Sequence, residues 1–138
     1  FKAINDTHGH AAGDAVLRHL AAALGASVRP SDVVARLGGE EFAVLLADAA
    51  EDGACAFAER LCRTIAERPA TVGGTTVRCT VSIGVATMAG DVADVDALLT
   101  RADLALYAAK HAGRDCVRRW HPDLPPTGST RPAADGRG

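Results

Sequence analysis

Apolar residues early in the chain recur with the period of a helix and then with that of strands. Asp14 stands where a helix N-cap is expected, and the helix should end before Pro30. Residues 33–37 and 42–46 are β-rich and apolar, and they flank a Gly-Gly turn, which predicts a hairpin. The apolar positions of the predicted helix are Val16, Leu17, Leu20, Ala21 and Leu24.

A second helix and a second hairpin follow. The helix is predicted over residues 51–67, and the hairpin lies within residues 71–86 and turns at Gly73-Gly74. The apolar positions of the helix include Phe57, Ala58, Leu61, Cys62 and Ile65. Alternating apolar positions then run along the hairpin at Val77, Cys79, Val81, Ile83 and Val85.

A third helix and a last strand complete the pattern. The helix is predicted over residues 95–111, with Gly113 as its C-terminal cap, and the strand over residues 115–120. Helices that alternate with hairpins predict an α+β fold, in which helices flank a mixed, largely antiparallel central sheet. We expect one domain over residues 1–120 and a disordered Pro- and Gly-rich tail over residues 121–138.

The amino-acid composition of the chain argues against several classes of function. The net charge of −2 argues against a nucleic-acid-binding surface, and no apolar run approaches the roughly 18 residues of a membrane span. The four cysteines form no CxxC pair, which argues against zinc. Cys55 and Cys62 lie about two helical turns apart and are expected to pack as small apolar residues, so we expect no disulfide framework, and a reducing cytoplasm fits better. The chain begins with Phe1 and its only methionine is Met88, so we expect a fragment of a longer protein.

The first hairpin carries unusual chemistry at its turn. Gly38 and Gly39 permit positive φ and leave room for a ligand, while Glu40 and Glu41 occupy the tip and the start of the returning strand. Neighbouring strand residues point to opposite faces, so the two carboxylates should differ in role. Hard oxygen ligands suit Mg²⁺ bound with phosphates, although an exposed acidic turn explains the same four residues.

Five motifs in order give the chain a resemblance to a known family. They are Asn5-Asp6-Thr7-His8-Gly9-His10-Ala11-Ala12-Gly13-Asp14, Gly38-Gly39-Glu40-Glu41-Phe42, Ser82-Ile83-Gly84-Val85-Ala86, Arg101-Ala102-Asp103 through Tyr107, Ala109 and Lys110, and Gly113-Arg114. Together they resemble the GGDEF family of diguanylate cyclases, in its Glu variant, from residue 1 to about residue 117.

The resemblance implies a fold like that of nucleotide cyclases and polymerase palm domains. It implies condensation of two GTP molecules into cyclic di-GMP with release of two pyrophosphates, between two domains that face each other as a homodimer. Two Mg²⁺ ions, or Mn²⁺ in their place, would serve each site. By the resemblance Glu40 binds metal and accepts the 3′-hydroxyl proton, with Glu41 in support. Lys2 lies near the triphosphate and stabilises the charge of the transition state.

Further residues match substrate contacts of the family. Asn5 and Asp14 would read guanine, and His10 would touch the substrate, although Asp14 also suits a helix cap and His10 a structural role. Lys110 and Arg114 would anchor the triphosphate, although cations at a helix C-terminus also complement its dipole.

A second site is implied by Arg29 and Asp32, which form an RxxD motif ahead of the glycine turn. In the resemblance this motif binds the cyclic di-GMP product as an inhibitor, and Arg60 adds a contact, although a solvated helix charge explains Arg60 equally well.

The family's metal-binding Asp and its first strand would lie before residue 1, so we expect this fragment to be poorly active. The alternative function is an inactive module that binds GTP or cyclic di-GMP and regulates a neighbour.

Overall fold

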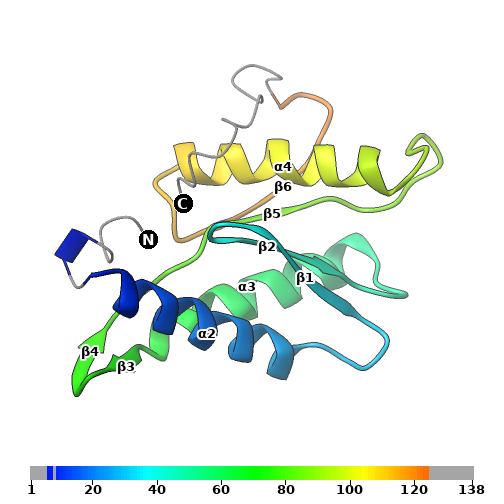
Figure 1. The fold of residues 1–138 in the computed structure, drawn as a ribbon. Helices are drawn as coiled ribbons and strands as arrows, with labels where there is room; N and C mark the ends of the chain where they lie inside the picture. Colours follow the sequence, from blue (N-terminus) through cyan, green and yellow to red (C-terminus); the bar gives the residue numbers. More distant parts are fainter. Residues whose placement is uncertain (1–5, 8, 125–138) are drawn as a thin grey trace. The chain divides into compact units, whose positions relative to one another are not determined.

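The computed structural model describes residues 6–7 and 9–124. Figure 1 labels the helices and strands of this part of the chain. They are α2 (His10–Ser27), β1 (Val33–Gly38), β2 (Glu41–Leu45), α3 (Glu51–Glu67), β3 (Ala70–Val72), β4 (Thr75–Val77), β5 (Ile83–Val85), α4 (Val95–His111) and β6 (Val117–Arg119). The mixed α+β class is confirmed, and the predicted bounds of α3 and α4 are those of the structure. Lys2, Asn5 and residues 125–138 of the predicted tail lie outside the described residues.

The described residues divide into two compact units. Of the described residues, unit 1 contains those up to Ala47 and residues 65–79, and unit 2 contains residues 48–64 and 80–124. The division falls within α3, whose last turn belongs to unit 1.

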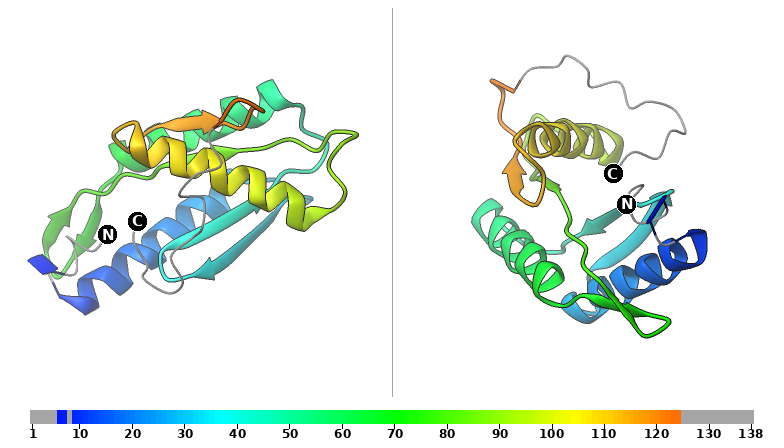
Figure 2. Two further views of the ribbon diagram at one scale, coloured as in Figure 1. Left: turned by 90° about the horizontal axis from the view of Figure 1, so that it is seen from above. Right: turned by 90° about the vertical axis from the view of Figure 1, so that its left-hand side faces the viewer.

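Unit 1 is built on α2 and two hairpins. Five apolar residues of α2 are buried, and Ala21 is exposed at the edge of their stripe. The β3–β4 hairpin contacts α2 through β3, as Figure 2 shows. The buried residues of α2 are Ala12, Val16, Leu17, Leu20 and Leu24.

The predicted N-cap at Asp14 is wrong. The helix begins at His10, and the N-cap position is Gly9, five residues before Asp14, with φ 89°. Glycine adopts this left-handed backbone without a steric penalty, so the chain turns into the helix before it reaches Asp14. Asp14 therefore lies on the exposed side of the second helical turn.

Unit 2 consists of β5, α4, β6 and most of α3. β5 and β6 pair in parallel, and α4 lies along both strands (Figures 1 and 2). Cys55 and Ala58 of α3 are buried with Val85 of β5 in one apolar cluster. Gly84 faces α4 closely, because a Cβ atom there would lie 2.2 Å from the backbone oxygen of Ala102.

The described strands form three two-stranded sheets. β1–β2 and β3–β4 are antiparallel hairpins, and β5–β6 is parallel. The long strand expected after Gly74 divides into β4 and β5. Val77, the last residue of β4, is buried, Arg78 after it is exposed and Cys79 is buried again, so the alternation continues past the end of the β3–β4 ladder.

Among residues 6–7 and 9–124, no helix is both long enough and apolar enough to cross a membrane.

Candidate functional site

The tip of the β1–β2 hairpin presents Glu40. Gly38 pairs with Glu41, so the two turn residues are Gly39 and Glu40 rather than the two glycines. Gly38 and Gly39 have φ of 146° and 51°, which confirms the predicted need for glycine. Glu40 and Glu41 are both half-buried. At the tip, two carboxylates therefore lie next to two glycines, which leave space for a ligand to approach the backbone.

An arginine that the sequence did not single out holds this turn. The Nε and Nη2 atoms of Arg36 donate hydrogen bonds to the Gly39 oxygen at 2.9 and 2.5 Å. The register slips between Arg36 and Gly38, which leaves Leu37 as the extra residue of a β-bulge. The only local sequence signal for these two hydrogen bonds is the spacing of three between Arg36 and Gly39. Many exposed arginines have the same spacing.

The donor set at the tip suits a hard cation. Within residues 6–7 and 9–124 no group of three or more His, Cys, Asp or Glu residues could hold a metal ion. A carboxylate such as that of Glu40 is a hard oxygen ligand, the kind that Mg²⁺ takes together with phosphate oxygens and water.

Two expected substrate contacts lie early in α2. His10 is the first helical residue, and Asp14 follows one turn later. Both side chains are exposed. Their access to solvent leaves them available to a ligand.

The C-terminal end of α4 carries the two expected triphosphate anchors. Lys110 lies in the last turn of α4, whereas Arg114 lies beyond it. The Gly113 and Arg114 amides donate to the Lys110 and Ala109 oxygens at 3.4 and 3.1 Å, which is the Schellman pattern and confirms Gly113 as the cap. Arg114 has φ 64°, so its place is set by this turn and not by a helical spacing of four.

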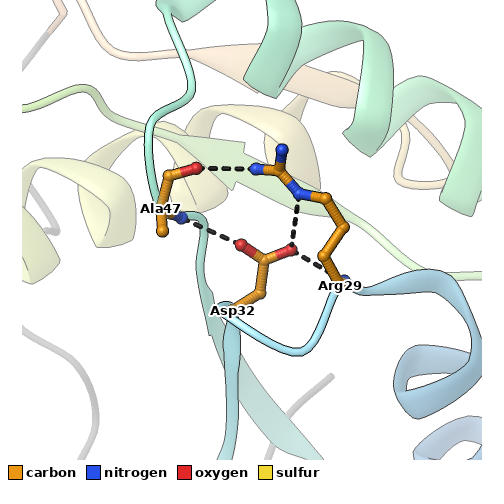
Figure 3. Close-up of polar contacts among 3 residues, drawn as sticks. All are labelled: Arg29, Asp32 and Ala47. Atoms are coloured by element: carbon orange, nitrogen blue, oxygen red, sulfur yellow. Dashed lines mark hydrogen bonds and ion pairs between the residues drawn. The ribbon is translucent and has the colours of Figure 1, made fainter.

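Arg29 and Asp32 of the RxxD motif contact each other (Figure 3). The Asp32 carboxylate accepts hydrogen bonds from the Ala47 amide at 2.9 Å and from the Arg29 amide at 2.9 Å. The Arg29 guanidinium donates to the Ala47 oxygen at 2.6 Å. The side chain of Asp32 is 2% exposed and that of Arg29 is 61% exposed. Asp32 thus joins the start of β1 to the end of β2, and Arg29 is presented outward.

These contacts keep Asp32 ionised. The backbone amide of Ala47, followed by that of Arg29, lowers the pKa of Asp32, although its burial acts in the opposite direction. A carboxylate with a lowered folded-state pKa stabilises the fold above the unfolded-state value, and the stabilisation is lost as the pH falls through the folded-state value.

We expect Asp32→Asn to lower the melting temperature at neutral pH, because its amide nitrogen faces a backbone donor. The difference from wild type should be constant between about pH 7 and 5. It should shrink below about pH 4, where Asp32 of the unfolded chain takes up a proton, and it should be lost as the pH falls through the lowered folded-state pKa. Thermal unfolding monitored by circular dichroism measures it, with the exposed Asp123→Asn as the matched control. A difference that persists undiminished at pH 3 would contradict this assignment.

Arg60 lies on the exposed side of α3 in unit 2. Its guanidinium carbon lies 5.7 Å from the ring centroid of Phe57, one turn earlier. This cation–π contact gives the side chain a structural partner on its own helix.

Arg101 also has structural partners that the sequence did not reveal. It donates to both carboxylate oxygens of Asp91 at 3.3 and 2.8 Å, and its guanidinium lies 4.0 Å from the ring centroid of Trp120. The Trp120 amide donates to the Val85 oxygen at 2.7 Å. Arg101 therefore fastens the segment after β6 to α4, and the lowered pKa of Asp91 follows from this pairing.

Comparison with solved structures places this fold and hairpin in one class, the GGDEF domains. The GGDEF domain of PA1120 (YfiN or TpbB) from Pseudomonas aeruginosa is 41% identical with a TM-score of 0.81, over 87% of this chain and 75% of that chain. The GGDEF domain of DgcB from Caulobacter crescentus, solved in complex with c-di-GMP, is 34% identical with a TM-score of 0.78, over 86% of this chain and 70% of that chain. The expected similarity to cyclase domains is thus confirmed.

The family model described as "Diguanylate cyclase, GGDEF domain" matches residues 1–116, and the chain belongs to this family. Among curated proteins, Diguanylate cyclase A of Treponema denticola is 41% identical over 125 residues, which cover 91% of this chain. The chain spans about a third of the length of that relative, 34%.

Proposed function

We propose that this domain is a diguanylate cyclase that condenses two GTP molecules into cyclic di-GMP and two pyrophosphates. The observation that carries the proposal is the position of Glu40 at a turn cleared of side chains by Gly38 and Gly39, in a chain matched by the family model over residues 1–116. Domains of this family generally use divalent metal ions.

Glu40 has two roles in this proposal. Its carboxylate contributes an oxygen ligand to magnesium and accepts the proton of the attacking 3′-hydroxyl, with Glu41 in support. When bound, the metal supplies charge neutralisation on the phosphates and aligns the attacking and leaving oxygens. The Arg36 contacts to Gly39 fix the turn backbone and so restrict where the Glu40 carboxylate can lie.

Cationic side chains balance the charge of the triphosphate. Lys110 and Arg114 bind its oxygens, and Lys2 stabilises the negative charge that spreads in the transition state. The exposed position of Arg114 directly after the helix cap supports this role, because the guanidinium can donate two hydrogen bonds to one phosphate.

Asn5 and Asp14 recognise the guanine base in this proposal, and His10 adds a further contact to the substrate. A carboxylate accepts from guanine N1–H and the exocyclic amine, and adenine offers no equivalent pair of donors. A site that leaves a polar group unpaired with the wrong base rejects that base strongly. The exposure of Asp14 on α2 supports this assignment over a cap role.

The reaction joins two nucleotides, so two copies of the domain must face each other, each holding one GTP. The purified full-length protein with GTP and Mg²⁺ should form cyclic di-GMP and two pyrophosphates per product, and ATP should give no cyclic product. GTP binding without any product would instead identify an inactive GTP-binding regulatory module.

Product binding at Arg29 is a second proposal, supported by the related DgcB domain solved in complex with c-di-GMP. The exposed Arg29 guanidinium, held by Ala47 and Asp32, is oriented to donate to a phosphate or a guanine. Asp32, with both oxygens engaged by backbone amides, would act mainly by holding Arg29, and Arg60 would add a contact.

We expect Arg29→Ala to weaken cyclic di-GMP binding about tenfold or more, because a charge-assisted hydrogen bond is lost. Calorimetric titration of the full-length protein with cyclic di-GMP measures the change, and the exposed Arg63→Ala on α3 is the matched control. Equal affinity of Arg29→Ala and Arg63→Ala would refute the assignment of Arg29.

A further inference from the structure

The turn that carries Arg114 has an unusual backbone. Gly113, Arg114 and Asp115 all have positive φ, of 109°, 64° and 47°. Glycine accepts such a conformation freely, but two successive non-glycine residues in the left-handed region are uncommon and persist only when their surroundings hold them.

Backbone hydrogen bonds fix the two ends of this turn. On the α4 side, the Arg114 amide donates to the Ala109 oxygen at 3.1 Å. On the β6 side, the Cys116 oxygen accepts from the Ile83 amide at 3.0 Å, where the β5–β6 ladder begins. Asp115 lies between these two anchors.

Two cysteine side chains add contacts on either side of Arg114. The Cys116 Sγ donates to the Ala109 oxygen at 3.3 Å, the same oxygen that receives the Arg114 amide. The Cys62 Sγ reaches the turn from α3 and donates to the Asp115 Oδ1 at 3.5 Å. The Cys62 thiol also lies 3.5 Å from the Val81 oxygen, so its single proton is shared between two acceptors.

The protonation of Cys62 agrees with a donor role. Burial, followed by the hydrogen bond to Asp115, raises the pKa of Cys62 to about 11. The thiol therefore keeps its proton at neutral pH, and a thiolate would instead repel the Asp115 carboxylate.

We infer that Cys62 and Cys116 are positioning residues for Arg114: their thiols hold the left-handed turn that presents its guanidinium to an anionic ligand. The inference deepens the proposed function, because the anionic ligand in question is the triphosphate of GTP. Neither thiol touches the substrate. Both act through the turn, so a protonated donor at each position should suffice and the sulfur atom itself should not be required.

The first test measures the turn itself in the full-length protein by amide hydrogen exchange. Cys62→Ala and Cys116→Ala should speed exchange of the Arg114 and Ile83 amides about fivefold, as expected for the loss of one modest hydrogen bond. Cys62→Ser and Cys116→Ser keep a donor and should restore slow exchange. Cys55→Ala is the matched control, since it removes a buried thiol of the same helix from an apolar cluster.

The second test measures the dissociation constants of GTP and guanosine for the same variants. The alanine variants should bind GTP about threefold to tenfold more weakly and guanosine equally well, with a smaller effect than Arg114→Ala. If the Arg114 and Ile83 amides exchange no faster in Cys62→Ala and Cys116→Ala than in the Cys55→Ala control, the inference is wrong. If Arg114→Ala itself keeps full GTP affinity while the thiol variants speed exchange, the proposed phosphate contact fails but the positioning of the turn stands.

Discussion

Glu40→Gln should lower the rate of cyclic di-GMP formation by about 10²–10⁴-fold, the usual contribution of a positioned general base, with a further loss from weaker metal binding. The amide has nearly the shape of the carboxylate, so the hairpin turn and its Arg36 contacts should survive. The variant removes the negative charge and the proton acceptor and leaves the residues assigned to guanine and triphosphate binding in place.

The rate at saturating GTP and the dissociation constant of GTP separate these effects. GTP binding by Glu40→Gln should stay within about tenfold of wild type, because the remaining contacts are retained. Glu59→Gln, at an exposed position of α3, is the matched control and should behave as wild type. If Glu40→Gln turns over GTP as fast as wild type, Glu40 takes no part in the reaction and the assignment is wrong.

Gly84→Ala should destabilise the protein by about 3 kcal/mol or more, at or above the upper end of the range for overpacking. A Cβ atom at this position would lie 2.2 Å from the Ala102 oxygen, 2.3 Å from the Leu106 nitrogen and 2.8 Å from the Leu106 Cα. All three atoms are backbone, so no side chain can move aside and α4 itself must shift away from β5. Lys110 and Arg114, the proposed triphosphate contacts, would move with α4, so GTP binding should weaken as well.

Thermal unfolding measures this effect, which should exceed about 10 °C because each kcal/mol shifts the midpoint by about 4 °C in a domain of this size. Gly53→Ala on α3 is the matched control, since a Cβ atom there meets nothing within 4 Å. Alanine in that helical position should be neutral or stabilising by about 0.5–1 kcal/mol. Equal melting temperatures of the two variants would contradict the close packing of α4 on Gly84.

The local features of the chain could be predicted because they depend on neighbouring residues. The bounds of α3 and α4 follow from apolar periodicity and from Gly113, and the hairpin tip at Glu40 follows from Gly38 and Gly39. The start of α2 was missed because a positive-φ glycine at position 9, with no side-chain cap, leaves little sequence signal.

The features that could not be predicted depend on residues far apart in the chain. The Asp32 side chain contacts the Ala47 amide, which is 15 residues away in the chain and becomes a neighbour only when the hairpin forms. Glycine is required at position 84 because α4, about 20 residues later in the chain, packs closely against it. The contact of Cys62 with Asp115 spans 53 residues. Such pairs leave no periodic trace in a single sequence.

The most direct test of the central claim, that the Glu40 carboxylate binds metal at a GTP site, is the metal dependence of cyclic di-GMP formation by Glu40→Cys. Thiolate is a soft ligand, so this full-length variant should be nearly inactive with Mg²⁺ and should recover activity with the thiophilic Cd²⁺, whereas Glu40→Ala should recover none. Identical metal profiles of Glu40→Cys and Glu40→Ala, or wild-type activity of either variant with Mg²⁺, would contradict the account.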